Sequence, residues 1–464
     1  SPTVTPGGRV GHTMFYDGQS GKLSIVGGST ATTPDRYLYQ IERDLIGSAD
    51  WIKGEQAAVS LSGHAVGFDP SQYKVVARVP EIYDPANNSW TLHPLAARSE
   101  DYYPQQFLVP RTPFRADSCR VVIVAPQRPS EYLDIPATGP AGPWRPIANG
   151  DPGFSPYTGA MYQPGKILVA GGEVPSIGWP TPPTIVGNAA TFDAANVKNG
   201  VGWQSSSAMA TARKFHNLVL LPTGAVLAVG GMRDSVIGAH TPERWDPGSR
   251  AWESWASAGD VRRNYHSTAL LLPDGRILTG GGWWFNAAHS DSNRDWKRLQ
   301  LFCPPYLFKA NGDTAARPVI QSAPDTIRWR QVFSVCVDDP ATISSACLIR
   351  PGATTHGFDS NQRFVPLTIE GRTGTGATGD PKRLFLAAPA SPDSAPAGDY
   401  LLFVLGSSDG PQVPSFARWV YVRGDGVEWC DVVPPGTITD LIPDIVGPTA
   451  IWFTWTAKAD DGEI

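Results

Sequence analysis

Two segments of the chain carry three residues of types that bind transition metals. Tyr265 and His266 are neighbours in the segment RNYHSTALLLPDGRILTGGG, and His356 lies in the later segment LIRPGATTHGFDSNQRFVPL. Imidazole nitrogens and a phenolate oxygen suit copper, and a loop from a second domain can add a ligand to an adjacent pair. Side chains of these types can bind one metal ion together where a fold brings them into contact. The alternative for Tyr265 is a buried ring with a satisfied hydroxyl group.

The histidines that precede repeated hairpins have a structural alternative. His12, His64, His216 and His266 all lie just before the first strand of a repeat. One residue type at one repeat position is more typical of a structural role, in which each imidazole bonds the backbone of a neighbouring unit, than of four separate ligands. We expect this structural role for the first three. For His266, which follows Tyr265, both interpretations stay open.

The elements that must position these residues are repeated β-hairpins. Each copy is an alternating apolar strand, a turn with Pro, Asp or Gly, a second strand and usually a paired glycine. Clear copies are HTMFYDGQSGKLSIVGG, YTGAMYQPGKILVAGG, HNLVLLPTGAVLAVGG and HSTALLLPDGRILTGGG, and two degraded copies begin at His64 and Tyr102. A spacing of about fifty residues is typical of a kelch blade, and paired glycines suit its crowded channel end, where backbones approach closely. Residues 1–300 are therefore predicted to form a kelch-type β-propeller of six or seven blades.

Past the last hairpin the pattern changes. Short apolar strands recur at about ten-residue intervals between turn residues, as in a β-sandwich; they are FSVCV, SACLIRPG, QRFVPLTIE, YLLFVLG and FARWVYVRG. An immunoglobulin-like sandwich is predicted over residues 301–424. Residues 430–464 look like the first strands of a fibronectin type III domain, too few to bury a core, so the natural chain is expected to continue. The predicted fold class is all-β.

The order of these motifs resembles the galactose oxidase and glyoxal oxidase family of mononuclear copper proteins, from about Tyr157 to Val422. The resemblance implies a propeller followed by an immunoglobulin-like domain. It also implies copper held by two histidines and two tyrosines, one of them joined to a cysteine so that its ring stores an oxidising equivalent. Such enzymes oxidise alcohols or aldehydes and reduce oxygen to peroxide. By this resemblance, Tyr265 matches the axial tyrosine, His266 its neighbouring histidine, and His356 the histidine of the second domain. The resemblance therefore implies a metal site formed by these three residues, with Tyr265 also the candidate catalytic residue.

The cysteine of that family is missing where the resemblance places it. The two candidate openings, GRVGH and SLSGH, carry Arg9 and Leu61 at the cysteine position. Tyr103 matches the partner tyrosine in one register and is a further candidate metal ligand, whereas in the other register no tyrosine falls there. Cys119 lies far along its hairpin and is a poor substitute. We therefore expect copper as the candidate ion but no tyrosyl–cysteine cofactor.

The composition is typical of an exported, turn-rich chain, with 48 Gly, 44 Pro and only 17% charged residues. Cys336 and Cys347 flank a strand–turn–strand segment, so we predict a disulfide between them. Cys303 and Cys430 bracket the second domain and could pair by the same logic. The protein is expected to be secreted or displayed at the cell surface.

Other features exclude several classes of function. The net charge of −5 is mild and no basic cluster exists, which argues against nucleic acid as a partner. No apolar run is long enough to span a membrane. Trp283, Trp284 and Phe285 are interpreted as blade packing rather than as a surface that stacks on sugars. The motif GTGATG at 374–379 is interpreted as a loop, because no βαβ unit surrounds it.

Two functions stay open, and with them whether the protein is an enzyme. In one, a secreted protein has kept the fold without radical activity, and it binds carbohydrate or another extracellular or surface protein as a binding or scaffold component. In the other, it is a mononuclear copper oxidase that converts small alcohols or aldehydes and produces hydrogen peroxide. The missing cysteine favours the first function. In either, Asp359, Asn361 and Arg363 are expected to hold the His356 loop by hydrogen bonds.

Overall fold

The computed structural model describes residues 79–423, apart from gaps at 85–88, 99–103, 111–117, 126–127, 137–138, 175–182, 234–237, 258, 260, 283–297, 375–381 and 407–411. Outside that range it describes the backbone of strands β1 to β6, β35 and β36. The chain divides into two compact units. The first comprises Ser1–Glu100, Ile135–Trp144 and Glu428–Ile464, and the second comprises Asp101–Asp134 and Arg145–Val427.

The described strands of the first unit form one antiparallel sheet, in the order β1-β2-β3-β4, and three separate hairpins. The predicted hairpin at His12 is present, with His12 opposite Gly27 in the pairing of β1 with β2. The hairpin β35–β36 is the part of the predicted fibronectin-like unit that lies among the described residues. The bounds are β1 Val10–Asp17, β2 Lys22–Ser29, β3 Tyr37–Glu42, β4 Ile52–Gln56, β5 Val66–Asp69, β6 Lys74–Ala77, β7 Glu81–Asp84, β8 Ser89–Leu92, the 3-10 turn η3 Pro94–Ala96, β35 Ile442–Val446 and β36 Ile451–Thr454.

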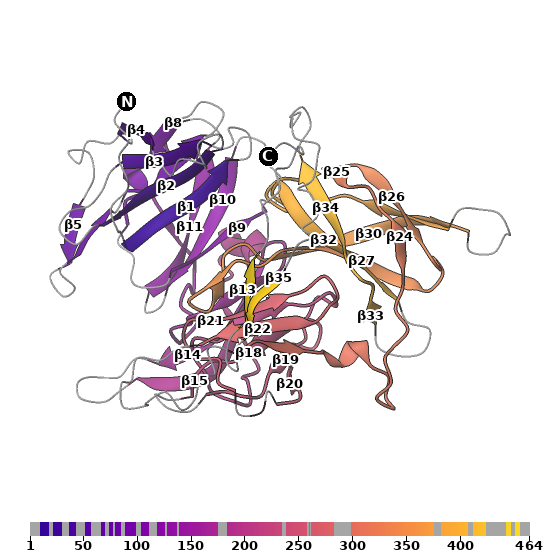
Figure 1. The fold of residues 1–464 in the computed structure, drawn as a ribbon. Coiled ribbons are helices and arrows are strands. Elements are labelled where there is room, and N and C mark those ends of the chain that lie inside the picture. The colour runs from indigo at the N-terminus through magenta and orange to yellow at the C-terminus, as the bar shows by residue number, and fades with distance from the viewer. Residues whose placement is uncertain are drawn as a thin grey trace. The chain divides into compact units, whose positions relative to one another are not determined.

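The second unit begins with antiparallel sheets that follow one another along the chain, as expected for propeller blades (Figure 1). Among the described strands these sheets are β9 to β12, β13 to β16, β17 to β20 and β21 to β23. Their bounds are β9 Gln105–Val109, β10 Ser118–Ala125, β11 Arg128–Pro136, β12 Arg145–Pro146, β13 Gly159–Gln163, β14 Lys166–Val174, β15 Thr184–Asp193, the 3-10 helix η4 Ala194–Asn199, β16 Gln204–Ser206, β17 Asn217–Leu220, β18 Val226–Val229, β19 Glu243–Trp245, β20 Trp252–Ser254, β21 Ser267–Leu271, β22 Ile277–Gly281 and β23 Gln300–Phe302.

Tight turns join the first two strands of these sheets where the sequence places Pro, Asp and Gly. In the turn between β17 and β18, the amide of Gly224 donates to the carbonyl of Leu221 at 2.9 Å. Gly224 and the equivalent Gly275 have φ values of 81° and 80°, a conformation that only glycine adopts without strain. The apolar strands that the turns connect are buried, and Val226, Leu227 and Ala228 of β18 are inaccessible to solvent.

The second half of this unit is a β-sandwich, coloured orange to yellow in Figure 1. Its strand order is β24-β26-β31-β30-β27-β32-β34-β25, and β33 pairs with β32. Its own core contains Phe333 and Val335 of β26, Leu348 of β27 and Leu402 of β32. The bounds are the 3-10 turn η6 Pro305–Leu307, β24 Ile320–Ser322, β25 Thr326–Arg328, β26 Val332–Val337, β27 Ile343–Arg350, β28 Thr354–Thr355, β29 Phe358–Asp359, β30 Arg363–Thr373, β31 Arg383–Ala387, β32 Gly398–Gly406, β33 Val413–Pro414 and β34 Arg418–Arg423.

The predicted all-β fold class, a propeller followed by a sandwich, is confirmed. A second core joins the two parts inside this unit, because Leu220 and Trp245 of the blades share one apolar cluster with Ile349, Leu401 and Phe403 of the sandwich. The helices in the described part of the chain are short, and none is long and apolar enough to cross a membrane.

The predicted disulfide between Cys336 and Cys347 is wrong, because both thiols are free. Cys336 lies on β26, which pairs with β24 and β31, whereas Cys347 lies on β27, which pairs with β30 and β32. The two strands are consecutive in sequence but are not neighbours in the sheet. The buried thiol of Cys347 instead donates to the carbonyl of Pro222 at 3.4 Å, and burial raises its pKa. Cys303 is also free, and its expected partner Cys430 lies outside the described residues.

Candidate metal site

Tyr265, His266 and His356 lie together. The rings of Tyr265 and His266 are stacked, with centroids 3.9 Å apart. The His356 ring lies 4.8 Å from that of His266 and 5.6 Å from that of Tyr265, both in edge-on orientation. The predicted convergence of a tyrosine–histidine pair from the last described blade with a histidine from the sandwich is therefore present.

The spacing of the two imidazoles fits a shared metal ion. A ring bound through nitrogen at about 2.0–2.1 Å has its centroid roughly 3.2 Å from the metal, so two rings bound about 90–105° apart around the metal have centroids about 4.5–5 Å apart. The observed separation is 4.8 Å, with ring planes at 80°. Across the described ranges, no three His, Cys, Asp or Glu side chains form a metal-binding group, so a third donor at this place would be the Tyr265 phenol. The other candidate ligand, Tyr103, lies outside the described residues.

His266 does not occupy the repeat position of His216, although the sequence suggests that it does. Leu220 pairs with Val226 in one blade and Leu271 with Ile277 in the next, so counting back places His216 level with Ser267. His266 is then level with Phe215, and these two residues share a left-handed backbone, with φ values of 63° and 56°. This shift of one residue turns the His266 ring outward, where it is exposed.

His216 is fully buried, and neither ring nitrogen has a hydrogen-bond partner. The expectation that its imidazole bonds the backbone of a neighbouring unit is therefore wrong. The ring instead packs against Gly171 of the preceding sheet, where an added Cβ would lie 2.6 Å from its Cε1 atom. Burial, with the nearby charge of Arg213, holds the pKa of His216 well below its usual range. The side chain of His12 and all of His64 lie outside the described residues.

His356 sits at the tip of the short hairpin β28–β29. Its Nδ1 atom lies 2.7 Å from the hydroxyl of Thr355. Burial, and secondarily the charge of His266, lowers the pKa of His356, so its imidazole is neutral at neutral pH, the form that binds metals. The next residue must be small, because a Cβ on Gly357 would lie 2.9 Å from the carbonyl oxygen of His216.

Asp359 and Asn361 hold this loop by hydrogen bonds, as predicted, whereas Arg363 bonds to carbonyl groups outside the loop. The Asp359 carboxylate accepts from the amides of Ala353 at 2.9 Å and of Asn361 at 3.1 Å, and burial raises its pKa. The Asn361 amide group donates to the carbonyl of Pro351 at 2.6 Å. Arg363 is buried and donates to backbone carbonyls, those of Leu108, Asp393 and Ser394.

An aromatic and charged group beside the site was not predicted. The Phe215 ring lies 5.0 Å from that of Tyr265 and 4.7 Å from that of Tyr157. The Tyr157 hydroxyl donates to the buried carboxylate of Glu173 at 2.6 Å, and Lys214 binds the other carboxylate oxygen at 2.7 Å. The sequence carried a signal for Phe215, because an aromatic residue precedes the histidine in two consecutive hairpins. These pairs are Phe215 before His216 and Tyr265 before His266.

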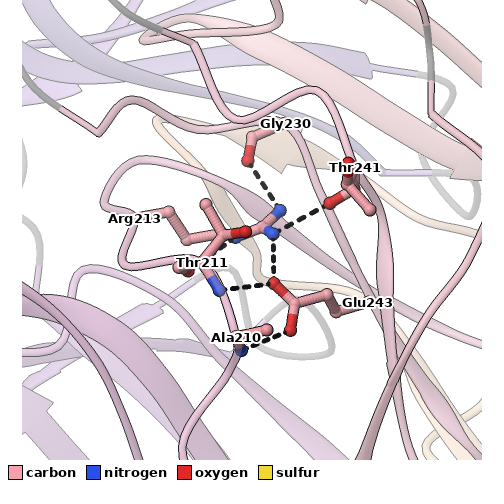
Figure 2. A network of polar contacts seen from close by, with 6 residues as sticks. All are labelled: Ala210, Thr211, Arg213, Gly230, Thr241 and Glu243. Carbon is pink, nitrogen blue, oxygen red and sulfur yellow. Dashed lines mark hydrogen bonds and ion pairs between the residues drawn. The ribbon is translucent and has the colours of Figure 1, made fainter.

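A buried ion pair fixes the segment that carries Lys214 and Phe215 (Figure 2). Arg213 and Glu243 have no solvent-exposed side-chain surface, and their nearest N and O atoms are 2.5 Å apart. Glu243 also accepts from the backbone amides of Ala210 and Thr211, while Arg213 donates to the carbonyls of Gly230 and Thr241. The partners lie in the segment that leads into β17 and in the blade β17–β20, so the pair sets the path of the chain into β17.

Two further sequence features gain no role here. Trp283, Trp284 and Phe285 lie outside the described residues. Of the GTGATG motif, only Gly374, which follows β30, is described.

Comparison with known proteins agrees with the fold. Residues 317–422 match the family described as "Galactose oxidase-like, Early set domain". The chain is 31% identical over 220 residues to galactose oxidase of Gibberella zeae, covering 46% of this chain and 30% of the relative. It is 32% identical over 230 residues to the aldehyde oxidase GLOX of Vitis pseudoreticulata, covering 46% of this chain and 42% of the relative. The predicted resemblance to galactose and glyoxal oxidases is confirmed.

A solved structure has a similar fold over most of the chain. It is a fungal alcohol oxidase of the AA5 family in complex with copper, with a TM-score of 0.64 over 89% of this chain and 85% of that chain. The sequence identity is 23%, so this likeness shows the fold alone. The chain spans less than half the length of the curated relatives named above.

Proposed function

We propose that the chain is a secreted copper-binding protein in which Tyr265, His266 and His356 hold the ion. The observation that carries this proposal is the meeting of the three rings, two of them imidazoles 4.8 Å apart from different domains. A bound copper ion would supply one-electron redox chemistry and a Lewis-acidic site. The chain's own contribution is to keep the His356 imidazole neutral, to rest it on the blades through Gly357, and to leave the His266 ring open to solvent.

We further propose that the protein lacks tyrosyl–cysteine radical activity and serves as an extracellular binding or scaffold component, with carbohydrate or another surface protein as its partner. Arg9 and Leu61 stand at the two candidate cysteine positions, and neither side chain can form a thioether. Cys119, the described cysteine nearest in sequence to Arg9 and Leu61, lies on β10. A two-electron oxidation on a single copper needs a second redox group, which these residues do not provide.

The alternative is an oxidase of small alcohols or aldehydes. The names of the relatives favour it, because galactose oxidase and an aldehyde oxidase match nearly half of the chain. It requires a residue other than cysteine to complete the redox pair.

One experiment separates the two functions. After copper loading, metal analysis of the wild-type protein is expected to give one copper per chain, and His356→Ala is expected to lose it, whereas His240→Ala keeps it. Electron paramagnetic resonance should show Cu(II) with nitrogen ligands and no tyrosyl radical after mild oxidation. Peroxide formed from galactose, glyoxal or methylglyoxal by the wild type, and abolished in His356→Ala, would establish the oxidase. Absence of specific copper binding would refute the copper site and the oxidase, and would leave the binding or scaffold function standing.

A further inference from the structure

The side chain of Gln362 docks the His356 hairpin onto a blade strand. Its Oε1 atom accepts a short hydrogen bond from the backbone amide of Leu220, and its Nε2 atom donates to the carbonyl of Leu218 at 3.2 Å. Both partners lie on β17, the edge strand of its four-stranded sheet. The side-chain amide of Gln362 thus pairs with the open edge of β17 as a backbone amide of a neighbouring strand would.

The same side chain is tied to the centre of the hairpin. Its Nε2 atom also lies 3.2 Å from Oδ2 of Asp359, and its backbone amide donates to Oδ1 at 2.9 Å. Since Asp359 also accepts from Ala353 and Asn361, the carboxylate organises the loop from within. Gln362 is therefore the link between a rigid loop and the blade strand on which that loop rests.

The seat of the hairpin sets the distance between the two imidazoles. His356 belongs to the sandwich and His266 to a blade, so the separation of their rings depends on how the hairpin lies on the blades. Besides Gln362, the hairpin rests on the blades through Gly357 against the backbone of residues 215–216 and through Phe358 against Phe107, with ring centroids 5.5 Å apart. Those two contacts are steric and apolar, whereas the Gln362 amide adds directional hydrogen bonds that fix the hairpin in register along β17.

We infer that Gln362 is a positioning residue that holds His356 at metal-binding distance from His266. The inference rests on the proposed copper site and adds a residue that does not touch the metal. Residues that orient a metal ligand in this way change metal affinity by about 10- to 100-fold when replaced.

The test uses Gln362→Glu, which keeps the acceptor for Leu220 but turns the donor toward Leu218 into a second acceptor. The matched control is Gln331→Glu, where the side-chain oxygen accepts from the amide of Arg328 at 2.9 Å on an exposed part of the sandwich. We expect the dissociation constant for Cu(II) to rise about 10- to 100-fold in the first variant and to stay unchanged in the second. The nitrogen hyperfine pattern of bound Cu(II) should change from two imidazoles to one.

Hydrogen exchange makes the result decisive, because it is a readout that needs no metal. Amide exchange of residues 354–359 should speed up in Gln362→Glu but not in Gln331→Glu, and unchanged exchange in Gln362→Glu refutes the positioning role itself. An unchanged dissociation constant for Cu(II) in Gln362→Glu would also overturn the inference. If the wild type binds no copper, the proposed copper site fails, while the exchange result still tests whether Gln362 seats the hairpin.

Discussion

Equivalent-looking residues in this chain have different roles because the repeats are out of phase by one position. His216 and His266 each follow an aromatic residue and precede an apolar strand, yet one is buried and the other is exposed. The sequence pointed to Tyr265, His266 and His356 because their residue types suit a metal. It could not show the phase of the repeats, which depends on strand pairing, and so it gave His216 a hydrogen-bonding role that the structure does not support.

The pH dependence of the free energy of unfolding should report the protonation of His216. Because burial lowers its folded-state pKa, the folded protein cannot take up the proton that the unfolded chain binds below about pH 6.5. Stability is therefore full above that pH and falls as the pH drops toward the lower, folded-state pKa, by at most about 1.4 kcal/mol per pH unit for one proton. His216→Phe removes this group, and denaturant unfolding at pH 7, 6 and 5 should show a flatter decline than in the wild type. An unchanged decline would mean that His216 is protonated in the fold.

The buried pair of Arg213 and Glu243 gives a second measurable residue effect. Glu243→Gln leaves the Arg213 charge buried without its carboxylate, so we expect a loss of about 3–5 kcal/mol in the free energy of unfolding. The control is Glu253→Gln on the adjacent strand, whose side chain is 64% exposed and 3.6 Å from Arg244. That change should cost less than about 1 kcal/mol. Equal losses in the free energy of unfolding, measured in urea, would show that burial does not make the Arg213–Glu243 pair more important than the exposed one.

Among the secondary-structure elements, the hairpins and their paired glycines were predictable, whereas the neighbours of each strand were not. The paired glycines were assigned to close backbone approach, and an added Cβ on Gly171 or Gly230 would lie 2.4 Å from a carbonyl oxygen of the next blade. The disulfide prediction failed because it took Cys336 and Cys347 to lie on adjacent strands. Sheet order in a sandwich is set by long-range packing, and no local pattern in FSVCVDDPATISSAC reports it.

The steric cost of adding a methyl group where two backbones approach closely can be separated from the cost of backbone strain. Gly171 and Gly200 have φ values of 63° and 76°, but an added Cβ meets nothing within 4 Å at Gly200. Gly200→Ala should therefore cost about 1–2 kcal/mol, from the left-handed backbone alone. Gly171→Ala should cost about 1–3 kcal/mol more, because the methyl group must displace the backbone of Arg213. Thermal unfolding of the two variants measures the difference, and similar midpoints would contradict a steric role for the paired glycines.

The second unit is held together by a core that no single segment of sequence reveals. Periodicity identified the blades and the sandwich as separate segments, and it does not show which of their apolar residues pack against one another. In the structure, Leu401 and Phe403 of the sandwich pack in one cluster with Leu220 and Trp245 of a blade, while Leu402, between them, faces the sandwich's own core. Strand β32 is therefore buried on both faces, and the site residue His356 lies on the same shared side.

A substitution in this shared core should destabilise both partners. Phe403 is fully buried, so Phe403→Ala should cost about 3–5 kcal/mol and expose strands on both sides of the cluster. The matched control is Phe333→Ala, which removes an equally large buried ring from the sandwich's own core. Hydrogen exchange of Val226–Val229 in β18 should rise in Phe403→Ala and stay near the wild-type rate in Phe333→Ala, although both variants lose protection in β32. If β18 responds to neither, the blades and the sandwich unfold independently. The ring cluster would then depend on the loop contacts of Gln362, Gly357 and Phe358.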